Sequence, residues 1–330
     1  MKKIALIGAT GNVGRGIAQA LLKKGITSQK NLSLYASPNS HGKSITFEGQ
    51  TFILQGADTC RFDETLCLFA TDSDISRKYV PIALEKGACV IDSSSAYRMQ
   101  SDVPLISAPV NGSLIHPNKH KLYSCPNCIA SPLSIVLAPL QKAYGIERVA
   151  VSTYQSTSGA GKAPMEELLE ETTCSLKKAP YNRTHFKRQI AFNVIPQIDS
   201  IQEDGYTKEE SKIIQEIQKI LNEPLKVTAT SVRVPVLVGH STALSISLKT
   251  PFQIEKLTAL LKNSPCISLS ENHFATPAEI EGSDLVHIGR IRHDPTLPNG
   301  LHLWTCSDNL RRGAATDAVE AAELLLKQLI

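Results

Sequence analysis

The sequence has no apolar run long enough to span a membrane. Its first apolar run, residues 4–7, ends at Gly8, so it is too short for the core of a secretion signal. No later run approaches the ~20 apolar residues that a membrane-spanning helix needs. Internal repeats and low-complexity tracts are also missing. We therefore expect a globular protein without a membrane span or a cleaved leader.

The net charge is small, and the cysteines have no regular spacing. Lys and Arg total 35 against 31 Asp and Glu, which leaves a formal charge of +4. That excess is too small to predict binding to nucleic acid or to a membrane surface. The eight cysteines are spread irregularly over 330 residues, whereas small secreted domains have dense, regular cysteines joined as disulfides. The pattern predicts a cytoplasmic protein whose cysteines are mostly buried, reduced thiols.

The length and composition of the chain are sufficient for two domains, because 330 residues with 42% hydrophobic content can build a sizeable core. In the first part, short apolar runs typical of buried parallel strands alternate with helical stretches. The runs cover residues 4–7, 31–36, 66–70 and 88–92, and the helical stretches end at residue 22 and cover residues 75–86. This alternation predicts a doubly wound α/β domain.

The pattern changes after Cys128, where longer strands follow with few helices between them. The elements expected there are helices over about residues 129–144, 207–221 and 313–329 and strands over residues 149–155, 227–234 and 242–248. Long strands without alternating helices favour an antiparallel or mixed sheet. The sequence therefore predicts a second domain of the α+β class and a boundary near Cys128.

Three glycines follow the first strand directly and open the first helix. Gly8 permits a tight turn, Gly11 lets backbone amides approach a pyrophosphate, and Gly14 lets the helix pack against the strand. The helix N-terminus then favours the bound anion. The spacing G-x-x-G-x-x-G differs from the commoner G-x-G-x-x-G, and a glycine-rich turn without a ligand is the alternative. The strand-turn-helix context favours a dinucleotide site.

The end of the second strand indicates which dinucleotide is bound. Enzymes that use NAD often carry an acidic residue there, which binds the ribose hydroxyls. Residues 35–43 contain no carboxylate, whereas the hydroxyls of Ser37 and Ser40 and the ammonium of Lys43 suit a 2′-phosphate. The sequence therefore favours NADP over NAD.

Cys125 and Cys128 precede the helix expected from about residue 129. A helix N-terminus favours a thiolate through its dipole and unsatisfied N–H groups, and the same amides can hold an oxyanion. A metal site would need a second Cys/His pair at suitable spacing, and none is found. A thioredoxin-like redox pair and two core cysteines are the remaining alternatives. Cys128 is the better nucleophile because it lies nearer the helix, and Cys125 is expected to be packed beneath it.

Six segments of the chain, in this order, resemble aspartate-semialdehyde dehydrogenases. They are residues 8–14 (GATGNVG), 125–128 (CPNC), 152–155 with 158–161 (STYQ, SGAG), 192–199 (FNVIPQID), 233–236 with 240–241 (RVPV, HS), and 307–310 with 313–315 (SDNL, GAA). Any one segment is weak evidence, but six in the right order are specific. The similarity extends over essentially the whole chain.

The resemblance implies an activity and an architecture. The implied reaction is the reversible, NADPH-dependent reduction of L-4-aspartyl phosphate to L-aspartate 4-semialdehyde and phosphate, which feeds lysine, diaminopimelate, threonine and methionine biosynthesis. The implied architecture is a Rossmann-like NAD(P)-binding domain over residues 1–127, joined by the last helix at about 311–330, and a catalytic and dimerisation domain over residues 128–310. A homodimer is implied as well.

The resemblance also assigns catalytic roles. Cys128 matches the nucleophile that forms an acyl thioester, and His240 matches the general acid/base, a task that suits an unperturbed imidazole pKa of about 6.5. Gln155 matches the amide that positions the thioester. Without the match, a histidine after a strand is more often structural, and a strand glutamine is an ordinary polar residue.

Binding roles follow in the same way. Arg233 matches the clamp for the substrate α-carboxylate, and Glu209 matches the carboxylate that meets its amino group. Taken alone, Glu209 and Lys212 would read as an exposed pair on one helix face. The remaining substrate matches are Arg98 and Lys212, for phosphate, and Asn127. The cofactor matches are Gly8, Thr10, Gly11, Asn12, Val13, Ser37, Ser40, Lys43, Ser158, Gly159 and Asn309.

The chain departs from the family pattern at three places. Ile129 and Ala130 stand where Ser or Thr is usual after the nucleophile. Asn39 stands where members that use NADP commonly have arginine, so Ser37, Ser40 and Lys43 must carry the 2′-phosphate. Asp72 stands where glycine is frequent, and its carboxylate would repel cofactor phosphates unless it points away.

Three rival functions share part of this pattern. An N-acetyl-glutamyl-phosphate reductase would keep the nucleophile but bind an acylated amino group, which Glu209 does not suit. A non-catalytic relative would be expected to lose the nucleophile or the base, and both Cys128 and His240 are present. A thiol-disulfide oxidoreductase would depend on Cys125 as well as Cys128.

Overall fold

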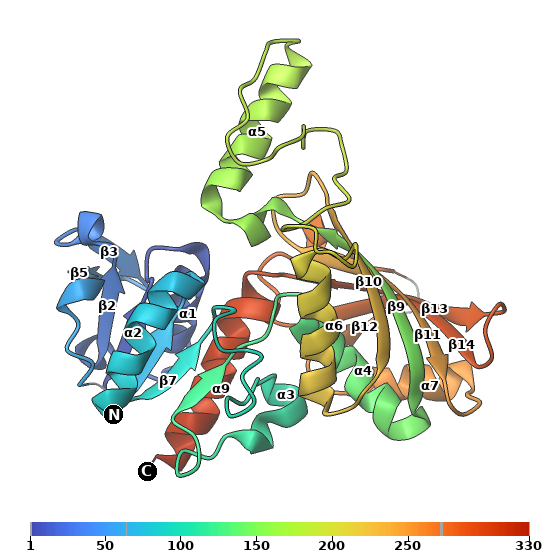
Figure 1. The fold of residues 1–330 in the computed structure, drawn as a ribbon, viewed down its shortest axis with the longest axis horizontal. Helices are drawn as coiled ribbons and strands as arrows, with labels where there is room; N and C mark the ends of the chain where they lie inside the picture. The colour runs from blue at the N-terminus through green and yellow to red at the C-terminus, as the bar shows by residue number, and fades with distance from the viewer. Residues whose placement is uncertain (1, 64, 271–272, 330) are drawn as a thin grey trace. The chain divides into compact units, whose positions relative to one another are not determined.

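The chain folds into two compact units, residues 1–127 with 314–330 and residues 128–313 (Figure 1). The computed structural model describes residues 2–63, 65–270 and 273–329. Within that part of the chain, no helix combines the length and apolarity that crossing a membrane requires. Nor do any three or more His, Cys, Asp or Glu side chains come together there in a way that could hold a metal ion.

The first unit contains a parallel sheet of six strands in the order β5-β2-β1-β6-β7-β8. The strands are β1 (Ile4–Ile7), β2 (Leu32–Ala36), β5 (Gln55–Gly56), β6 (Leu66–Phe69), β7 (Cys89–Asp92) and β8 (Leu122–Ser124). Every residue of β1, β6 and β7 is buried, as expected of parallel strands covered on both faces. A separate hairpin joins β3 (Ser44–Phe47) and β4 (Gln50–Ile53).

Helices cover both faces of this sheet. The α-helices described in this unit are α1 (Asn12–Lys23), α2 (Ser73–Glu85), α3 (Ala108–Asn111) and α9 (Thr316–Gln328). Buried residues of α1 and α9 share one core cluster with the side chains of Ile4 and Leu6. Buried residues of α2 share a second cluster with Ala5 and Ile7. Because side chains alternate along β1, the two clusters lie on opposite faces, as the predicted doubly wound arrangement requires.

The second unit is built on a mixed sheet of six strands in the order β10-β9-β11-β14-β13-β12. The strands are β9 (Ile146–Gln155), β10 (Lys226–Arg233), β11 (His240–Leu248), β12 (Ile267–Leu269), β13 (Val286–Asp294) and β14 (Gly300–Ser307). β10 and β9 pair in parallel, β11 is antiparallel to both β9 and β14, and β12 is parallel to β13. The prediction of a mixed sheet is therefore confirmed.

Several α-helices accompany this sheet. They are α4 (Ala130–Tyr144), α5 (Lys162–Leu176), α6 (Lys208–Leu221), α7 (Ile254–Lys262) and α8 (Pro277–Ile280). α6 begins at a capping box, in which Thr207 and Glu210 each accept a hydrogen bond from the other's main-chain N–H. Ile213, Ile217 and Ile220 keep helical spacing and are buried. α5 and the loop after it project from the sheet of this unit (Figure 1).

The structure differs from the predicted elements in three respects. α5 and α7 interrupt a region expected to have few helices, and the β3–β4 hairpin was not expected at all. The last helix begins at Thr316 rather than at Gly313, which adopts a φ of +107°. That left-handed conformation ends any helical path through Gly313.

Candidate active site

The candidate nucleophile lies at the start of the second unit. Cys128 and Ile129 form the turn that leads into α4, and Ile129 is the N-cap residue of that helix. Cys128 is half-buried and therefore not sealed inside the protein. Its main chain packs against Gly313, where a Cβ atom would lie 2.7 Å from the Cys128 carbonyl oxygen. This close approach and the positive φ both require glycine at position 313.

The buried guanidinium of Arg233 interacts electrostatically with this thiol and with the buried carboxylate of Glu209. Arg233 ends β10, Glu209 lies in the first turn of α6, and each is 6% exposed. Burial lowers the pKa of Arg233, while the negative charges of Cys128 and Glu209 oppose that shift. Arginine nevertheless stays protonated in proteins. A cation near a cysteine favours the thiolate, which is the reactive form.

Gln155 connects the sheet to α6. Its side-chain nitrogen donates to Glu209 Oε1 at 3.2 Å, and its oxygen accepts a hydrogen bond from Thr153 Oγ1 at 2.9 Å. Thr153 and Gln155 are buried, whereas Ser152 and Tyr154 between them are exposed. Because side chains alternate along a strand, β9 presents Gln155 to the face that α6 covers.

Lys212 follows Glu209 on α6. Its Nζ lies 3.6 Å from Glu209 Oε2 and 2.9 Å from Asp199 Oδ2. The predicted placement of Glu209 and Lys212 on one helix face is therefore confirmed. The lysine side chain is 31% exposed, so a phosphate can approach the ammonium, which it would share with two carboxylates.

A second buried group surrounds His240, the first residue of β11. Its Nδ1 accepts a hydrogen bond from the Ser156 main-chain N–H at 3.0 Å and lies 3.0 Å from Ser156 Oγ. Asn309 Oδ1 accepts hydrogen bonds from the Ser156 hydroxyl at 3.0 Å and from the Gly239 N–H at 2.9 Å. The Ser158 hydroxyl donates to the same oxygen. Segments that follow β9, precede β11 and follow β14 thus fix the imidazole together.

Gly159 joins the two groups. A Cβ atom at this position would lie 3.0 Å from His240 Nε2 and 3.2 Å from Arg233 Nη1. Burial lowers the pKa of His240 to about 3, the Arg233 charge adds to this effect, and the Gly239 main chain opposes it. The imidazole is therefore neutral at pH 7. A neutral imidazole can accept a proton and return it, so the acid/base role of His240 stays a prediction.

The arrangement contains the parts that acyl transfer requires. A half-buried thiol supplies the nucleophile, and a guanidinium favours its thiolate. The imidazole and the Gln155 amide offer polar groups for a carbonyl oxygen. A carboxylate and a guanidinium on neighbouring elements can hold the ammonium and carboxylate of an amino acid. The second unit thus combines a covalent catalyst with recognition of a charged substrate.

The glycine loop of the first unit leaves an open N-terminus on α1. The N–H groups of Gly8 and Ala9 both donate to the Tyr35 carbonyl oxygen in β2. A Cβ atom at Gly14 would lie 2.1 Å from the Gly8 oxygen, so only glycine fits there. Gly11 caps α1 without a side-chain hydrogen bond, and the first turn holds no acidic residue. The first-turn N–H groups are therefore suited to an anion such as a pyrophosphate.

Asp72 has a structural task at another helix in the same unit. It is the N-cap residue of α2, and its Oδ1 accepts hydrogen bonds from the N–H groups of Asp74 at 3.1 Å and Ile75 at 2.9 Å. A carboxylate at this position satisfies helix N–H groups and the helix dipole. This cap accounts for a carboxylate where the proteins that the sequence resembles often have glycine.

The structure distributes the predicted site residues over both units. In the first unit, Ser37 and Lys43 are exposed after β2 with Ser40 half-buried, Asn127 is buried, and Arg98 Nη2 donates to the Ser93 carbonyl oxygen at 2.8 Å. The glycine-loop residues Gly8, Thr10, Gly11, Asn12 and Val13 lie there too. The second unit brings together Cys128, Gln155, Ser158, Gly159, Glu209, Lys212, Arg233, His240 and Asn309. Cys125 is buried in the first unit, and burial raises its thiol pKa to about 12.

Three residues that contact the site were not expected from the sequence. They are Thr153, Ser156 and Asp199. Hydroxyl residues are common in and after strands, so no residue type or spacing distinguishes Ser156. The one available signal was its position between the predicted site residues Gln155 and Ser158.

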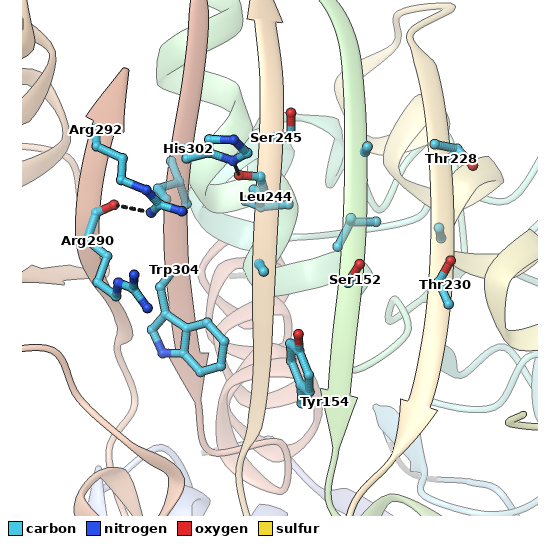
Figure 2. A pocket seen from close by; sticks show the side chains of 15 residues that line it. Ser152, Tyr154, Thr228, Thr230, Leu244, Ser245, Arg290, Arg292, His302 and Trp304 are labelled. Atoms are coloured by element: carbon cyan, nitrogen blue, oxygen red, sulfur yellow. Dashed lines mark hydrogen bonds between the residues drawn. The ribbon is translucent and has the colours of Figure 1, made fainter. Parts of the chain in front are cut away.

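A hollow on the other face of the second sheet is separate from these groups. Figure 2 shows side chains of β9, β10, β11, β13 and β14 around it, including Tyr154, Arg290 and Trp304. Its volume is about 350 Å³, and the rings of Tyr154 and Trp304 lie 5.5 Å apart at its edge. Tyr154 points away from the face that carries Gln155. The hollow is therefore not the catalytic site.

Known proteins share both the sequence and the fold. Residues 3–117 match the NAD binding domain of semialdehyde dehydrogenases, and residues 137–312 match their dimerisation domain. Aspartate-semialdehyde dehydrogenase of Rickettsia bellii is 42% identical over 98% of this chain and 97% of its own length. That of Aquifex aeolicus is 39% identical over 99% and 98%.

A solved structure extends this similarity to three dimensions. Aspartate semialdehyde dehydrogenase II from Vibrio cholerae, complexed with ASA, matches with a TM-score of 0.97 at 38% identity, covering 100% of this chain and 99% of that chain. The resemblance predicted from six segments is confirmed, as are the Rossmann-like first domain and the α+β second domain. The chain belongs to the aspartate-semialdehyde dehydrogenase family.

Proposed function

We propose that this chain catalyses the reversible, NADPH-dependent reduction of L-4-aspartyl phosphate to L-aspartate 4-semialdehyde and phosphate. One observation carries the proposal: Arg233 interacts electrostatically with both the half-buried Cys128 thiol and the Glu209 carboxylate. A thiol, a guanidinium and a carboxylate match the acyl, carboxylate and ammonium groups of this substrate. The product would supply lysine, diaminopimelate, threonine and methionine biosynthesis.

Cys128 divides the reaction into two steps. Its thiolate adds to the acyl carbon, and the carbonyl electron pair moves onto oxygen. When that pair re-forms the carbonyl, the bond to phosphate breaks and phosphate leaves with the bonding electrons, taking a proton from solvent. Hydride then adds to the carbon of the Cys128 thioester, and the adduct collapses to aldehyde and thiolate. Two moderate barriers replace one high one.

The surrounding side chains recognise the rest of the substrate. Arg233 holds the α-carboxylate through its guanidinium fork, and Glu209 pairs with the α-ammonium. Gln155, held by Glu209 and Thr153, orients the acyl group. An N-acetylated substrate carries no ammonium, so it could not form this ion pair with the Glu209 carboxylate. Arg98 and Lys212 are the residues we assign to phosphate, and Asn127 is assigned to substrate binding.

The dinucleotide fits the residues present. The first-turn N–H groups of α1 lack a side-chain cap, and the Cβ position of Gly11 has only the Gly8 oxygen nearby, at 3.6 Å. When bound, NADPH supplies the hydride. We assign its binding to Gly8, Thr10, Gly11, Asn12, Val13, Ser158, Gly159 and Asn309. Ser37, Ser40 and Lys43 would hold the 2′-phosphate, which makes NADP the expected cofactor over NAD.

The domains and the assembly follow the same proposal. We assign cofactor binding to residues 1–127 with the last helix, about residues 311–330, and catalysis and dimerisation to residues 128–310. The open sheet face with Tyr154 and Trp304 (Figure 2) is the surface we assign to a second copy of the chain. We place the enzyme in the cytoplasm, where reducing conditions keep Cys128 a thiol.

A spectrophotometric assay of nicotinamide reduction tests the function. The purified enzyme is given L-aspartate 4-semialdehyde with NADP or NAD, each with and without phosphate. We expect NADPH to form only when phosphate is present and faster than NADH. N-acetyl-glutamate semialdehyde is the matched control and should give no reaction. Turnover of the acetylated aldehyde in preference to aspartate semialdehyde would overturn the proposal.

A further inference from the structure

The loop that follows β2 begins next to the glycine loop. The N–H groups of Gly8 and Ala9 both donate to the carbonyl oxygen of Tyr35, one residue before the end of β2. A nucleotide whose pyrophosphate is held at the N-terminus of α1 therefore has the carboxyl end of β2 beside it. In parallel sheets of this kind, the adenosine ribose is recognised at that end. Residues 37–43 are thus the segment that meets the 2′ position of the ribose.

Main-chain hydrogen bonds hold this loop in one conformation. The His41 N–H donates to the Pro38 carbonyl oxygen at 3.1 Å, and the Gly42 N–H donates to that of Leu54 at 2.9 Å. The Leu54 N–H donates in turn to the Lys43 carbonyl oxygen at 2.9 Å. A loop that is fixed before its ligand arrives loses little conformational freedom on binding.

The His41 side chain is fixed as well, and its contact decides where its proton lies. The N–H of Gly56, the last residue of β5, donates to His41 Nδ1 at 3.0 Å. Gly56 pairs with Ala36, the last residue of β2, so the ring lies at the carboxyl end of both strands. A main-chain N–H can only donate, so Nδ1 carries a lone pair and the neutral ring has its proton on Nε2. The ring is exposed, and its Nε2–H points away from Gly56 as a donor for a ligand.

The charges near this donor have opposite effects on a phosphate. Residues 35–43 contain no carboxylate, and Lys43 adds an exposed cation. One acidic side chain lies at the end of β5, because Asp58 Oδ1 occupies the space that a Cβ on Gly56 would need. Its charge opposes an anion, so a preference for a 2′-phosphate has to come from the donors of the loop. An N–H group binds a charged phosphate oxygen more strongly than it binds a neutral hydroxyl.

We infer that His41 is a specificity-determining residue, whose Nε2–H donates to the 2′-phosphate of the dinucleotide and so favours NADP over NAD. The inference rests on the function proposed above, in which NADPH supplies the hydride. The Gly56 N–H aims the ring, and Ser37, Ser40 and Lys43 supply the other contacts. NAD carries a hydroxyl at the 2′ position and gains less from the same donor.

Calorimetry with two small probes on the full-length enzyme isolates this contact. Adenosine 2′,5′-bisphosphate carries the 2′-phosphate, and 5′-AMP has a hydroxyl in its place. His41→Asn offers its Oδ1 to the Gly56 N–H in place of Nδ1 but has no atom at the position of Nε2. We expect this variant to bind the bisphosphate about tenfold more weakly than the parent and to bind 5′-AMP within about twofold of it.

His116→Ala is the matched control. His116 is an exposed histidine of the same unit that lies outside this loop, so its removal should leave both affinities unchanged. If the parent prefers the bisphosphate and His41→Asn prefers it equally, the role of His41 is wrong while the choice of NADP stands. If the parent binds both probes equally, His41 and the choice of NADP are both wrong. If the enzyme does not turn over aspartate semialdehyde, the proposed reaction is wrong, and the two affinities still decide the role of His41.

Discussion

Two clusters of buried polar residues in the second unit have opposite characters. The site cluster is Gln155, Ser156, Glu209, Arg233 and His240. The arm cluster is Glu167 and Glu171 of α5 with the main chain of residues 183–191. All of the named carboxylates are less than a tenth exposed, yet only one cluster contains a buried donor without a partner.

In the arm cluster every carboxylate oxygen is used. Glu167 accepts main-chain N–H groups of Thr184, His185 and Phe186 at 2.8–3.0 Å. Glu171 Oε2 accepts the N–H groups of Ile190 and Ala191 at 2.8 and 3.0 Å. These bonds satisfy the main chain of a loop that forms no helix or strand.

The difference between the clusters separates structure from chemistry. A polar cluster whose members satisfy one another stabilises the fold and has nothing left to offer a ligand. The site cluster keeps His240 Nε2 buried without a partner and gathers charges around a half-buried thiol. Burial alone would have assigned both clusters the same role. Four changes should separate them, the first two acting on activity and the last two on stability.

Cys128→Ala should have the largest effect on activity. Without the nucleophile we expect kcat for phosphate-dependent NADP reduction to fall by roughly a thousandfold or more, while NADP binding and Tm change little. Cys306→Ala is the control: Cys306 is buried in β14, and burial raises its thiol pKa to about 11. That variant should lower Tm and keep kcat. Turnover by Cys128→Ala near the parent rate would exclude a covalent mechanism.

Arg233→Lys should weaken substrate binding with less effect on chemistry. Lysine keeps the charge but cannot bind both carboxylate oxygens through a planar fork. We expect KM for aspartate semialdehyde to rise roughly tenfold to a hundredfold, with KM for NADP nearly unchanged. Steady-state kinetics with each substrate varied in turn measure both. An unchanged semialdehyde KM would reject the carboxylate clamp.

Some elements could be predicted from the sequence because their apolar residues repeat at a regular spacing, and others lack such a repeat. The strand at Ile4–Ile7 and the helix ending at Leu221 were predicted because apolar residues recur at strand or helical spacing. α5 was missed because its inward face carries Glu167 and Glu171, so no apolar stripe marks it. Their main-chain partners are N–H groups of a loop 17 to 20 residues later in the chain, which no local pattern reveals.

The candidate site also contains residues that could be predicted from the sequence and residues that could not. Cys128 was predicted from its position before a helix and from the family resemblance, whereas Glu209 and Arg233 were predicted from the resemblance. Ser156 was not, because its contact to His240 uses the main-chain N–H, which every residue but proline has. The lowered pKa of His240 comes from its burial where three strands meet, and no segment of sequence carries that information.

Glu167→Gln should act on stability and not on catalysis. The amide keeps one oxygen but turns an NH₂ group toward N–H donors, which leaves buried groups unsatisfied. We expect a loss of about 2 kcal/mol in unfolding free energy with kcat/KM within about twofold of the parent. Glu166→Gln, on the same helix and in an exposed ion pair with Lys162, is the matched control. Denaturant unfolding of all three proteins provides the comparison, and equal midpoints would contradict the structural role of Glu167.

Mild acid should have the smallest effect on stability, and it should act on the arm cluster by protonating the Glu167 carboxylate. Burial would raise the pKa of Glu167, but the N–H groups of Phe186, Thr184 and His185 outweigh it and hold the pKa below its ordinary value. A group with a lowered folded pKa contributes its full stability above the unfolded value, about 4.3, and loses it as the pH falls through the folded value. The protection of the amides of residues 184–186, measured against their intrinsic exchange rate at each pH, should therefore fall below about pH 4.3, and this fall should be absent in Glu167→Gln. His240 contributes no such acid sensitivity until lower pH, since its pKa of about 3 keeps the ring neutral throughout this window. Acid should thus loosen the arm cluster while the hydrogen bond between Ser156 and His240 persists, and exchange that accelerates equally in both clusters would show that their difference in hydrogen bonding does not govern their response to pH.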